Sequence, residues 1–208
     1  CQSVDKVRPF IEQYEIAEAE HVKAADEFTS FNDFFYRKLK PEARPVDAAI
    51  DSVVFPADGR HLGFAKATEV EGVFMKGQRF DLPKLLGDKI LAEKFAGGAA
   101  VFSRLCPVDY HRFHFPVAGV PGEARLINGP LQSVNPLALR DRLAILLENK
   151  RYITEIETEK SGKVLMLEIG ATNVGSVNHT FVPTRPVAKG EEKGYFAFGG
   201  SATLTLFE

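Results

Sequence analysis

After about residue 51, the chain consists mostly of short apolar segments separated by Gly and Pro, a pattern typical of antiparallel strands. Two segments have helical spacing instead: residues 82–86, with Pro83 in the first turn, and residues 137–149. The predicted strands are residues 53–54, 61–67, 70–75, 99–105, 124–127, 151–159, 163–169 and 176–182.

The first 40 residues have helical periodicity. Residues 10–28 are rich in Glu, Ala and Lys with a narrow apolar stripe, which predicts an amphipathic helix. Ser30 and Asp33 resemble a capping box for a second helix, which Pro41 should end. We therefore expect an α+β fold: residues 1–45 form an N-terminal helical arm, and residues 46–208 form a mostly antiparallel, β-rich catalytic domain with one or two inserted helices.

At the end of the chain, Gly199 and Gly200 precede Ser201, and apolar residues then alternate with threonines. This pattern predicts a tight turn that delivers Ser201 at the mouth of a strand, with Leu204 and Leu206 on one face. Because glycine lacks a Cβ, the Ser201 hydroxyl could approach the Gly200 carbonyl. The simplest alternative is a hairpin turn followed by an edge strand.

Composition narrows the classes of function. The 208 residues carry a formal net charge of -2, which gives no basic surface for nucleic acid. The two cysteines, Cys1 and Cys106, favour a reducing compartment over a disulfide-stapled secreted domain. The sequence has no apolar run of about eighteen residues, so we expect no transmembrane segment. Because it opens on Cys1 without a Met, we expect that its natural start lies upstream.

Three positions are candidates for chemistry. Asp58 lies in a Pro and Gly turn, where a surface Asx-turn is the ordinary interpretation. His111 and His114 are three residues apart, so a helical turn would place both on one face, whereas a strand would separate them. We interpret the two histidines as a partly buried pair of titratable groups.

A serine hydroxyl becomes a good nucleophile when a base removes its proton, and an imidazole oriented by a carboxylate does this well. Ser201, one of the two histidines and Asp58 could form such a set. The bond attacked would be the Gly200–Ser201 peptide itself. Rearrangement to an ester, β-elimination and hydrolysis would then leave a pyruvoyl group at position 201, an electrophilic ketone able to form an imine with a substrate amine.

The motifs resemble those of the phosphatidylserine decarboxylase family from about Phe31 to the last residue. Each motif alone is weak, but eight in order are a specific signal. The segments that carry the resemblance are residues 31–39, 56–59, 76–78 with 85–87, 109–114, 133–135, 170–176, 189–191 and 198–201.

The resemblance implies that Asp58, His114 and Ser201 are the self-cleavage triad, that Gly200–Ser201 is the cleavage site, and that His111 assists decarboxylation or proton return. It implies phosphatidylserine as substrate, phosphatidylethanolamine as product and a pyruvoyl cofactor made from Ser201. It also implies peripheral membrane contact through the N-terminal helices, on the cytoplasmic side. The oligomeric state stays open, and a homodimer is compatible with the sequence.

Two departures from the family pattern leave alternatives open. Ala202 stands where the family usually has Thr or Ser, so a non-cleaving lipid-binding homologue is one alternative. The family commonly continues past Glu208, so we expect a longer natural chain; otherwise only residues 201–208 would form the small cleavage product, which could dissociate. The other alternative is a zinc hydrolase that uses Asp58, His111 and His114 as ligands.

Overall fold

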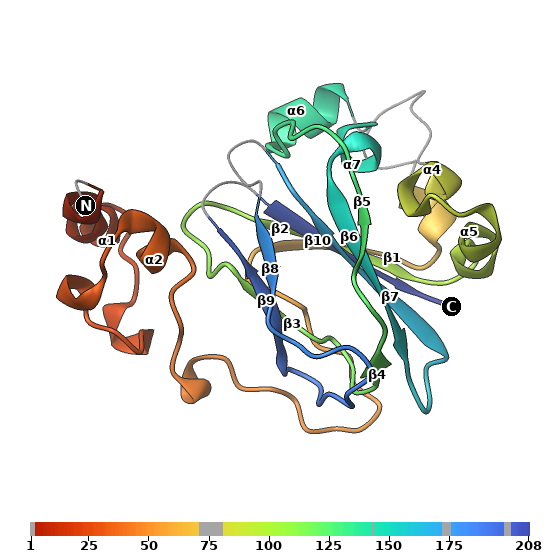
Figure 1. Cartoon of the computed structure of the whole chain (residues 1–208), viewed down its shortest axis with the longest axis horizontal. Helices are drawn as coiled ribbons and strands as arrows, with labels where there is room; N and C mark the ends of the chain where they lie inside the picture. Colours follow the sequence, from red (N-terminus) through yellow and green to blue (C-terminus); the bar gives the residue numbers. More distant parts are fainter. Residues whose placement is uncertain (1–2, 71–80, 143, 172–175, 198–200) are drawn as a thin grey trace.

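The computed structural model describes residues 3–70, 81–142, 144–171, 176–197 and 201–208. The arm lies at one end of the molecule, and a long segment without regular structure leads from it along the body to the first strand (Figure 1). The elements of the arm are the 3₁₀ helices η1 (Val4–Lys6), η2 (Glu18–Glu20), η3 (Ala25–Glu27) and η4 (Pro41–Ala43), and the α-helices α1 (Val7–Gln13) and α2 (Phe31–Phe35).

The prediction of one helix over residues 10–28 was wrong, because α1 ends at Gln13 and Glu15 has a positive φ of 50°. The segment with the narrow apolar stripe instead forms a short helix followed by 3₁₀ turns. The cap predicted for α2 is confirmed: Ser30 Oγ accepts a hydrogen bond from the Asp33 amide at 3.1 Å. That helix ends at Phe35, well before Pro41.

The arm has its own small apolar cluster, made of Val7, Ile11, Ala25, Phe28 and Phe34. These side chains are at most 6% exposed. The aromatic residues that the sequence places on the helices therefore serve first to hold the arm together.

The body contains two antiparallel sheets, which confirms the predicted α+β class. The larger sheet has the strand order β1-β2-β10-β7-β6-β4, with β5 also paired to β6, and the smaller has the order β3-β9-β8. The strands are β1 (Arg60–Phe64), β2 (Ala100–Leu105), β3 (Arg112–His114), β4 (Val120–Pro121), β5 (Arg125–Ile127), β6 (Arg151–Glu157), β7 (Lys163–Ile169), β8 (Val177–His179), β9 (Glu192–Phe196) and β10 (Ser201–Phe207).

The larger sheet is buried on both faces. Leu204 and Leu206 of β10 join the core that includes residues of α4, α5 and α7, whereas Met166 of β7 packs with Phe113 and Phe196 of the smaller sheet. The helices of the body are α4 (Leu82–Leu86), α5 (Lys89–Phe95), α6 (Pro136–Asp141) and α7 (Ala144–Glu148).

Strand β10 is a central strand, so the edge-strand alternative is wrong. It pairs with β2 on one side and β7 on the other, and Ser201 is its first residue, opposite Leu105. The predicted alternation is confirmed, since Leu204 and Leu206 share one face. The turn predicted at Gly199 and Gly200 lies outside the described residues.

The strand predicted at 163–169 and the helix predicted at 82–86 are confirmed residue for residue. Residues 53–54 are not a strand, and the helix predicted at 137–149 is two short helices, α6 and α7. Helix α5 and strands β3 and β9 were not predicted. The strand predicted at 70–75 falls almost entirely outside the described residues.

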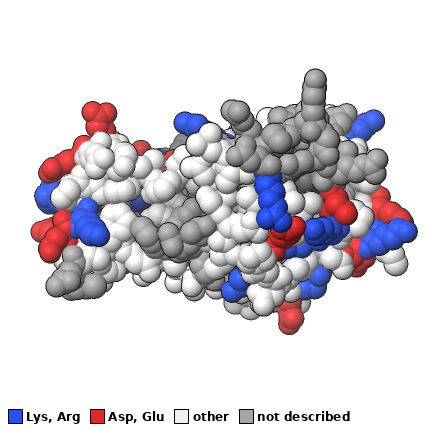
Figure 2. Space-filling model, turned by 90° about the horizontal axis from the view of Figure 1, so that it is seen from above, with Lys and Arg blue, Asp and Glu red and all other residues white. Residues whose placement is uncertain are grey.

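The face seen in Figure 2 carries acidic and basic side chains side by side at both ends, with a largely uncharged surface between them. No large basic area gathers on the described residues of this face, as the small net charge led us to expect. None of the described helices has the length and apolar character needed to cross a bilayer.

Candidate active site

Asp58 is held at the end of the larger sheet by the glycine that follows it. Gly59 has φ of 140°, and a Cβ at this position would lie 2.3 Å from the carbonyl oxygen of Arg104. Only glycine fits so close to the backbone of β2. Asp58 is thereby fixed beside the carboxyl end of that strand.

Ser201 lies across the same strand. Strand β2 runs between β1 and β10, with Arg60 opposite Arg104 on one side and Ser201 opposite Leu105 on the other. Since adjacent strands are about 5 Å apart, the backbones at Asp58 and at the start of β10 are about 10 Å apart. Two residues separated by 143 positions are thus brought to one end of the sheet.

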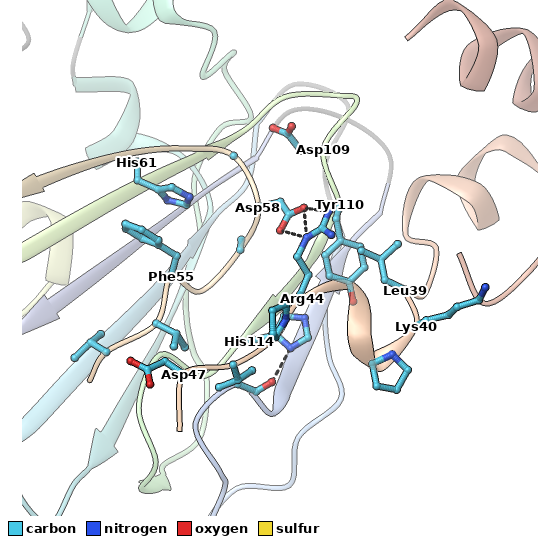
Figure 3. A pocket seen from close by; sticks show the side chains of 18 residues that line it. Leu39, Lys40, Arg44, Asp47, Phe55, Asp58, His61, Asp109, Tyr110 and His114 are labelled. Carbon is cyan, nitrogen blue, oxygen red and sulfur yellow. Dashed lines mark hydrogen bonds and ion pairs between the residues drawn. The ribbon is translucent and has the colours of Figure 1, made fainter. Parts of the chain in front are cut away.

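The partner of Asp58 is Arg44, which follows η4 at the end of the arm (Figure 3). Arg44 Nε donates to both carboxylate oxygens, at 3.0 and 2.9 Å, and Nη2 donates to Oδ2 at 2.7 Å. These hydrogen bonds raise the pKa of Arg44. The cluster of cations near residue 40, which could be explained by the helix dipole alone, therefore contains one residue with a specific partner.

His114 is oriented by a backbone carbonyl. Its Nδ1 lies 3.0 Å from the oxygen of Gly190, which can only accept, so Nδ1 carries the proton and Nε2 carries a lone pair. Burial lowers the pKa of His114, while the Gly190 carbonyl, Glu192 and Asp58 act in the opposite direction. The neutral imidazole is the form expected at pH 7, and Nε2 can then act as a base.

Asp58 and His114 both line a cavity of about 890 Å³. In Figure 3, Arg44 is bound to Asp58, and His114 lies near this pair. Phe55 and His61 lie on another side of the same cavity. Tyr110 also lines it, and burial raises the pKa of this phenol, which keeps it protonated. Ser201, whose side chain is completely buried, is not among the described residues that line the cavity.

His111 and His114 are separated, so the helical turn that would bring them together is absent. Residues 112–114 form strand β3, with an irregularity in its pairing between Phe113 and His114. His111 is fully buried, its ring centroid lies 3.9 Å from that of Phe35 in α2, and its Nδ1 donates to the Asp109 carbonyl at 2.8 Å. His111 therefore links the site to the arm.

The Ser201 hydroxyl is buried and has no hydrogen-bond partner among the described residues. The same is true of the hydroxyls of Thr203 and Thr205. The alternation of β10 places all three on the face opposite Leu204 and Leu206. Nearly all buried hydroxyls in proteins are satisfied, so an unpaired one marks a candidate reactive group. This environment fits a residue that is to become a ketone, because a ketone has no proton to donate.

The zinc alternative finds no support in the described part of the chain. No group of three or more His, Cys, Asp or Glu side chains there could hold a metal ion. Asp58 is bound to Arg44, and His111 is directed to Asp109 rather than toward His114. The three residues do not form the ligand set that a zinc hydrolase would need.

Sequence reasoning missed a buried charge cluster between the two sheets. Glu168 of β7 accepts hydrogen bonds from Lys193 of β9 at 2.5 Å, and His179 Nε2 lies 3.0 Å from its other oxygen. The Glu168 and Lys193 side chains are 0% exposed. Lys193 follows two glutamates in a stretch that resembles solvated surface, whereas Glu168 is the one charged residue in the apolar run 164–169, so only their tertiary neighbours identify the pair.

The chain was then compared with known proteins. The sequence profile of the phosphatidylserine decarboxylase family matches residues 31–208. A phosphatidylserine decarboxylase proenzyme of Chlamydia pneumoniae is 51% identical over 202 residues, which cover 97% of this chain and 67% of the relative. The proenzyme of Chlamydia muridarum is 53% identical with the same coverage, and that of Chlamydia caviae is 50% identical over 98% of this chain and 68% of its own. The profile and these relatives, together with the site at the end of β2, show that the chain belongs to the phosphatidylserine decarboxylase family.

Proposed function

We propose that this decarboxylase makes its reactive group from its own chain, by cleaving the Gly200–Ser201 bond with Asp58, His114 and Ser201. The observation that carries the proposal is the buried Ser201 hydroxyl, which has no partner among the described residues and begins a strand two strand spacings from Asp58. Thr203 and Thr205 also have no hydrogen-bond partner among the described residues, so it is the position of Ser201 at the end of β2 that distinguishes it from them.

His114 Nε2 takes the Ser201 proton as the hydroxyl oxygen adds to the Gly200 carbonyl. Asp58 favours the imidazolium that forms, since its negative charge raises the pKa of His114. The peptide rearranges to an ester, and loss of the Ser201 Cα proton expels the Gly200 carboxylate. The remaining dehydroalanine becomes an imine, and one water then releases ammonia and leaves a ketone.

The pyruvoyl group at position 201 would supply an electrophilic ketone that reacts with the amine of phosphatidylserine. It would also accept the electron pair that stays on the substrate when carbon dioxide leaves. We assign His111 to proton transfer in this second reaction. It lies outside the Asp58 and His114 cavity and packs against Phe35, so a change at His111 should leave cleavage largely intact.

After cleavage, the strand that begins at position 201 should remain in place. Backbone hydrogen bonds join β10 to β2 and β7 along its length, and residues 201–206 are at most 2% exposed. The apolar surface that these residues bury favours the bound peptide even after the covalent link is gone. We therefore expect the two products to stay together until the protein is denatured.

Ala202 is compatible with cleavage. Its side chain is 0% exposed and belongs to the core on the opposite face of β10 from the Ser201 hydroxyl. A hydroxyl at position 202 would enter that core, on the opposite face of β10 from the Ser201 hydroxyl. The departure from the usual family residue thus leaves the nucleophile and base in place.

We also propose peripheral membrane contact through the arm, as a lipid substrate requires access to a bilayer. Tyr14 and Val22 are 48% and 57% exposed there, and Lys38 and Lys40 are exposed cations. These side chains suit an anionic lipid surface, whereas the arm phenylalanines Phe28, Phe34 and Phe35 are buried.

The division of roles is tested with three histidine variants. His114→Gln should leave the chain uncut, whereas His111→Gln should be cut but release little carbon dioxide from phosphatidylserine. His61→Gln is the matched control, since His61 lines the same cavity but bonds to Ser103. Loss of cleavage in all three variants, or equal activity in all three, would contradict the assignment.

A further inference from the structure

Four exposed apolar side chains gather in one short segment between the arm and β1. Val46, Ile50, Val53 and Phe55 are 46%, 78%, 49% and 61% exposed. Single exposed apolar residues are normal on a protein surface, but several in ten residues indicate a contact surface.

The backbone of this segment is fastened to the body. Lys189 Nζ donates to the carbonyls of Ala49 and Ser52 at 2.5 and 3.2 Å, and the Val54 amide donates to the Pro116 carbonyl at 3.1 Å. The side chains are therefore presented by a fixed backbone, not by a loose loop.

Val53, Val54 and Phe55 lie between two hollows. On one side they line the cavity that contains Asp58 and His114. On the other they line an apolar hollow of about 350 Å³, whose other walls include Val101, Thr205 and Phe207. Thr205 lies four residues along β10 from Ser201, about 14 Å away at the rise of an extended strand.

Phe55 forms the ridge between the two hollows. Its ring stacks on His61 with centroids 3.9 Å apart and an interplanar angle of 15°, so one face is held while much of the side chain stays exposed. Figure 3 shows this pair at the edge of the cavity that Asp58 and His114 line. A rigid aromatic side chain in such a position can guide an apolar chain out of a polar site.

We propose that Val53, Val54 and Phe55, with the apolar hollow behind them, form the subsite for an acyl chain of the phospholipid substrate. The inference rests on the proposed function, which places the reactive ketone at the start of β10, the strand whose Thr205 and Phe207 line the apolar hollow. An acyl chain is the occupant because the apolar hollow shares Val53, Val54 and Phe55 with the cavity that Asp58 and His114 line, and the substrate carries apolar chains beside its polar head.

A binding experiment tests the subsite without turnover. The chain contains no tryptophan, so Phe55→Trp introduces a single indole as a fluorescent reporter, and Ile90→Trp on α5 is a matched control because Ile90 is 71% exposed and lines neither hollow. Phosphatidylserine brominated on its acyl chains, in detergent micelles, should quench Phe55→Trp several-fold more than Ile90→Trp. Equal quenching by brominated phosphatidylcholine would show general lipid contact and contradict a substrate subsite, as would no quenching.

Kinetics supply the second readout. For phosphatidylserine with long acyl chains, Phe55→Ser should raise KM about tenfold with little change in kcat, since a partly buried aromatic contact of this size is lost. KM for glycerophosphoserine, which has no acyl chain, should not change, and Phe55→Leu should restore KM for the long-chain lipid. An equal rise of KM for both substrates would contradict the subsite, whereas a wild-type protein that decarboxylates neither would contradict the proposed function instead.

Discussion

Arg44 binds both carboxylate oxygens of Asp58, with its shortest contact at 2.7 Å. Arg44 follows η4 at the end of the arm, whereas Asp58 stands at the end of the larger sheet. The pair therefore ties the arm to the site and fixes the orientation of the carboxylate.

Arg44→Gln should slow self-cleavage about tenfold, because Asp58 loses the partner that holds its carboxylate in place. The rate is measured by following the uncut chain on denaturing gels after cell-free synthesis. Arg142→Gln is the control, since Arg142 pairs with Glu148 on an exposed surface. A cleavage rate unchanged by Arg44→Gln would show that the orientation of Asp58 does not depend on this pair.

Self-cleavage should depend on pH through His114. Burial lowers the pKa of this histidine below its ordinary value of about 6.5, so the neutral base is present at pH 7 and is lost on acidification only below that value. A plot of cleavage rate against pH should be flat from pH 8 to 7 and fall below pH 6.5. A rate that already falls by half between pH 8 and 7 would exclude His114 as the base.

The buried pair of Glu168 and Lys193 gives a stability prediction. Lys193→Met should lower the free energy of unfolding by about 3–5 kcal/mol, because it leaves the Glu168 carboxylate buried beside His179 alone. The double variant Glu168→Gln and Lys193→Met removes both charges and should recover most of that loss. Urea denaturation measures both values.

Lys163→Met is the comparison for that experiment. Lys163 pairs with Glu155 and Glu157, but its side chain is 32% exposed, so the change should cost less than about 1 kcal/mol. If Lys193→Met costs no more than Lys163→Met, the buried pair does not hold the sheets together.

His21 should make the protein less stable in acid. Its pKa is lowered to about 4 by burial and then by Arg37, against the opposing charges of Glu18 and Glu20 and with a further lowering by Lys40. Between pH 6.5 and about 4 the unfolded chain takes up a proton that the folded imidazole does not, so the free energy of unfolding falls as pH falls. His21→Phe should flatten the dependence of the urea midpoint on pH in this range; an equally steep dependence would contradict the assignment.

Local signals predicted the elements that depend on local physics. The patterns of residues 163–169 and 82–86 predicted strand β7 and helix α4. The spacing of Ser30 and Asp33 predicted the helix cap. The prediction of a helix over residues 10–28 was wrong because the narrow apolar stripe does not support a helix beyond Gln13. Sequence pattern alone overestimated two helices, at residues 10–28 and 137–149, and missed α5.

The residues of the site also fall into two groups: those that the sequence suggests and those that only the fold brings together. Asp58, His114 and Ser201 carry chemistry that a sequence can suggest, and the fold brings Asp58 and Ser201 to the same end of β2. Neither Arg44, the partner of Asp58, nor the separate buried pair of Glu168 and Lys193 could be predicted, because these contacts span 14 and 25 residues. Whether such a charge is buried depends on long-range packing, which no local pattern records.

The central claim is that the Gly200–Ser201 bond cleaves itself, and the mass of the purified, denatured protein tests it most directly. We predict a large fragment ending at Gly200 and a small fragment lighter by one ammonia than a peptide with an N-terminal serine, both absent from Ser201→Ala. A single uncut chain that retains its full mass, in wild type as in Ser201→Ala, would contradict the account.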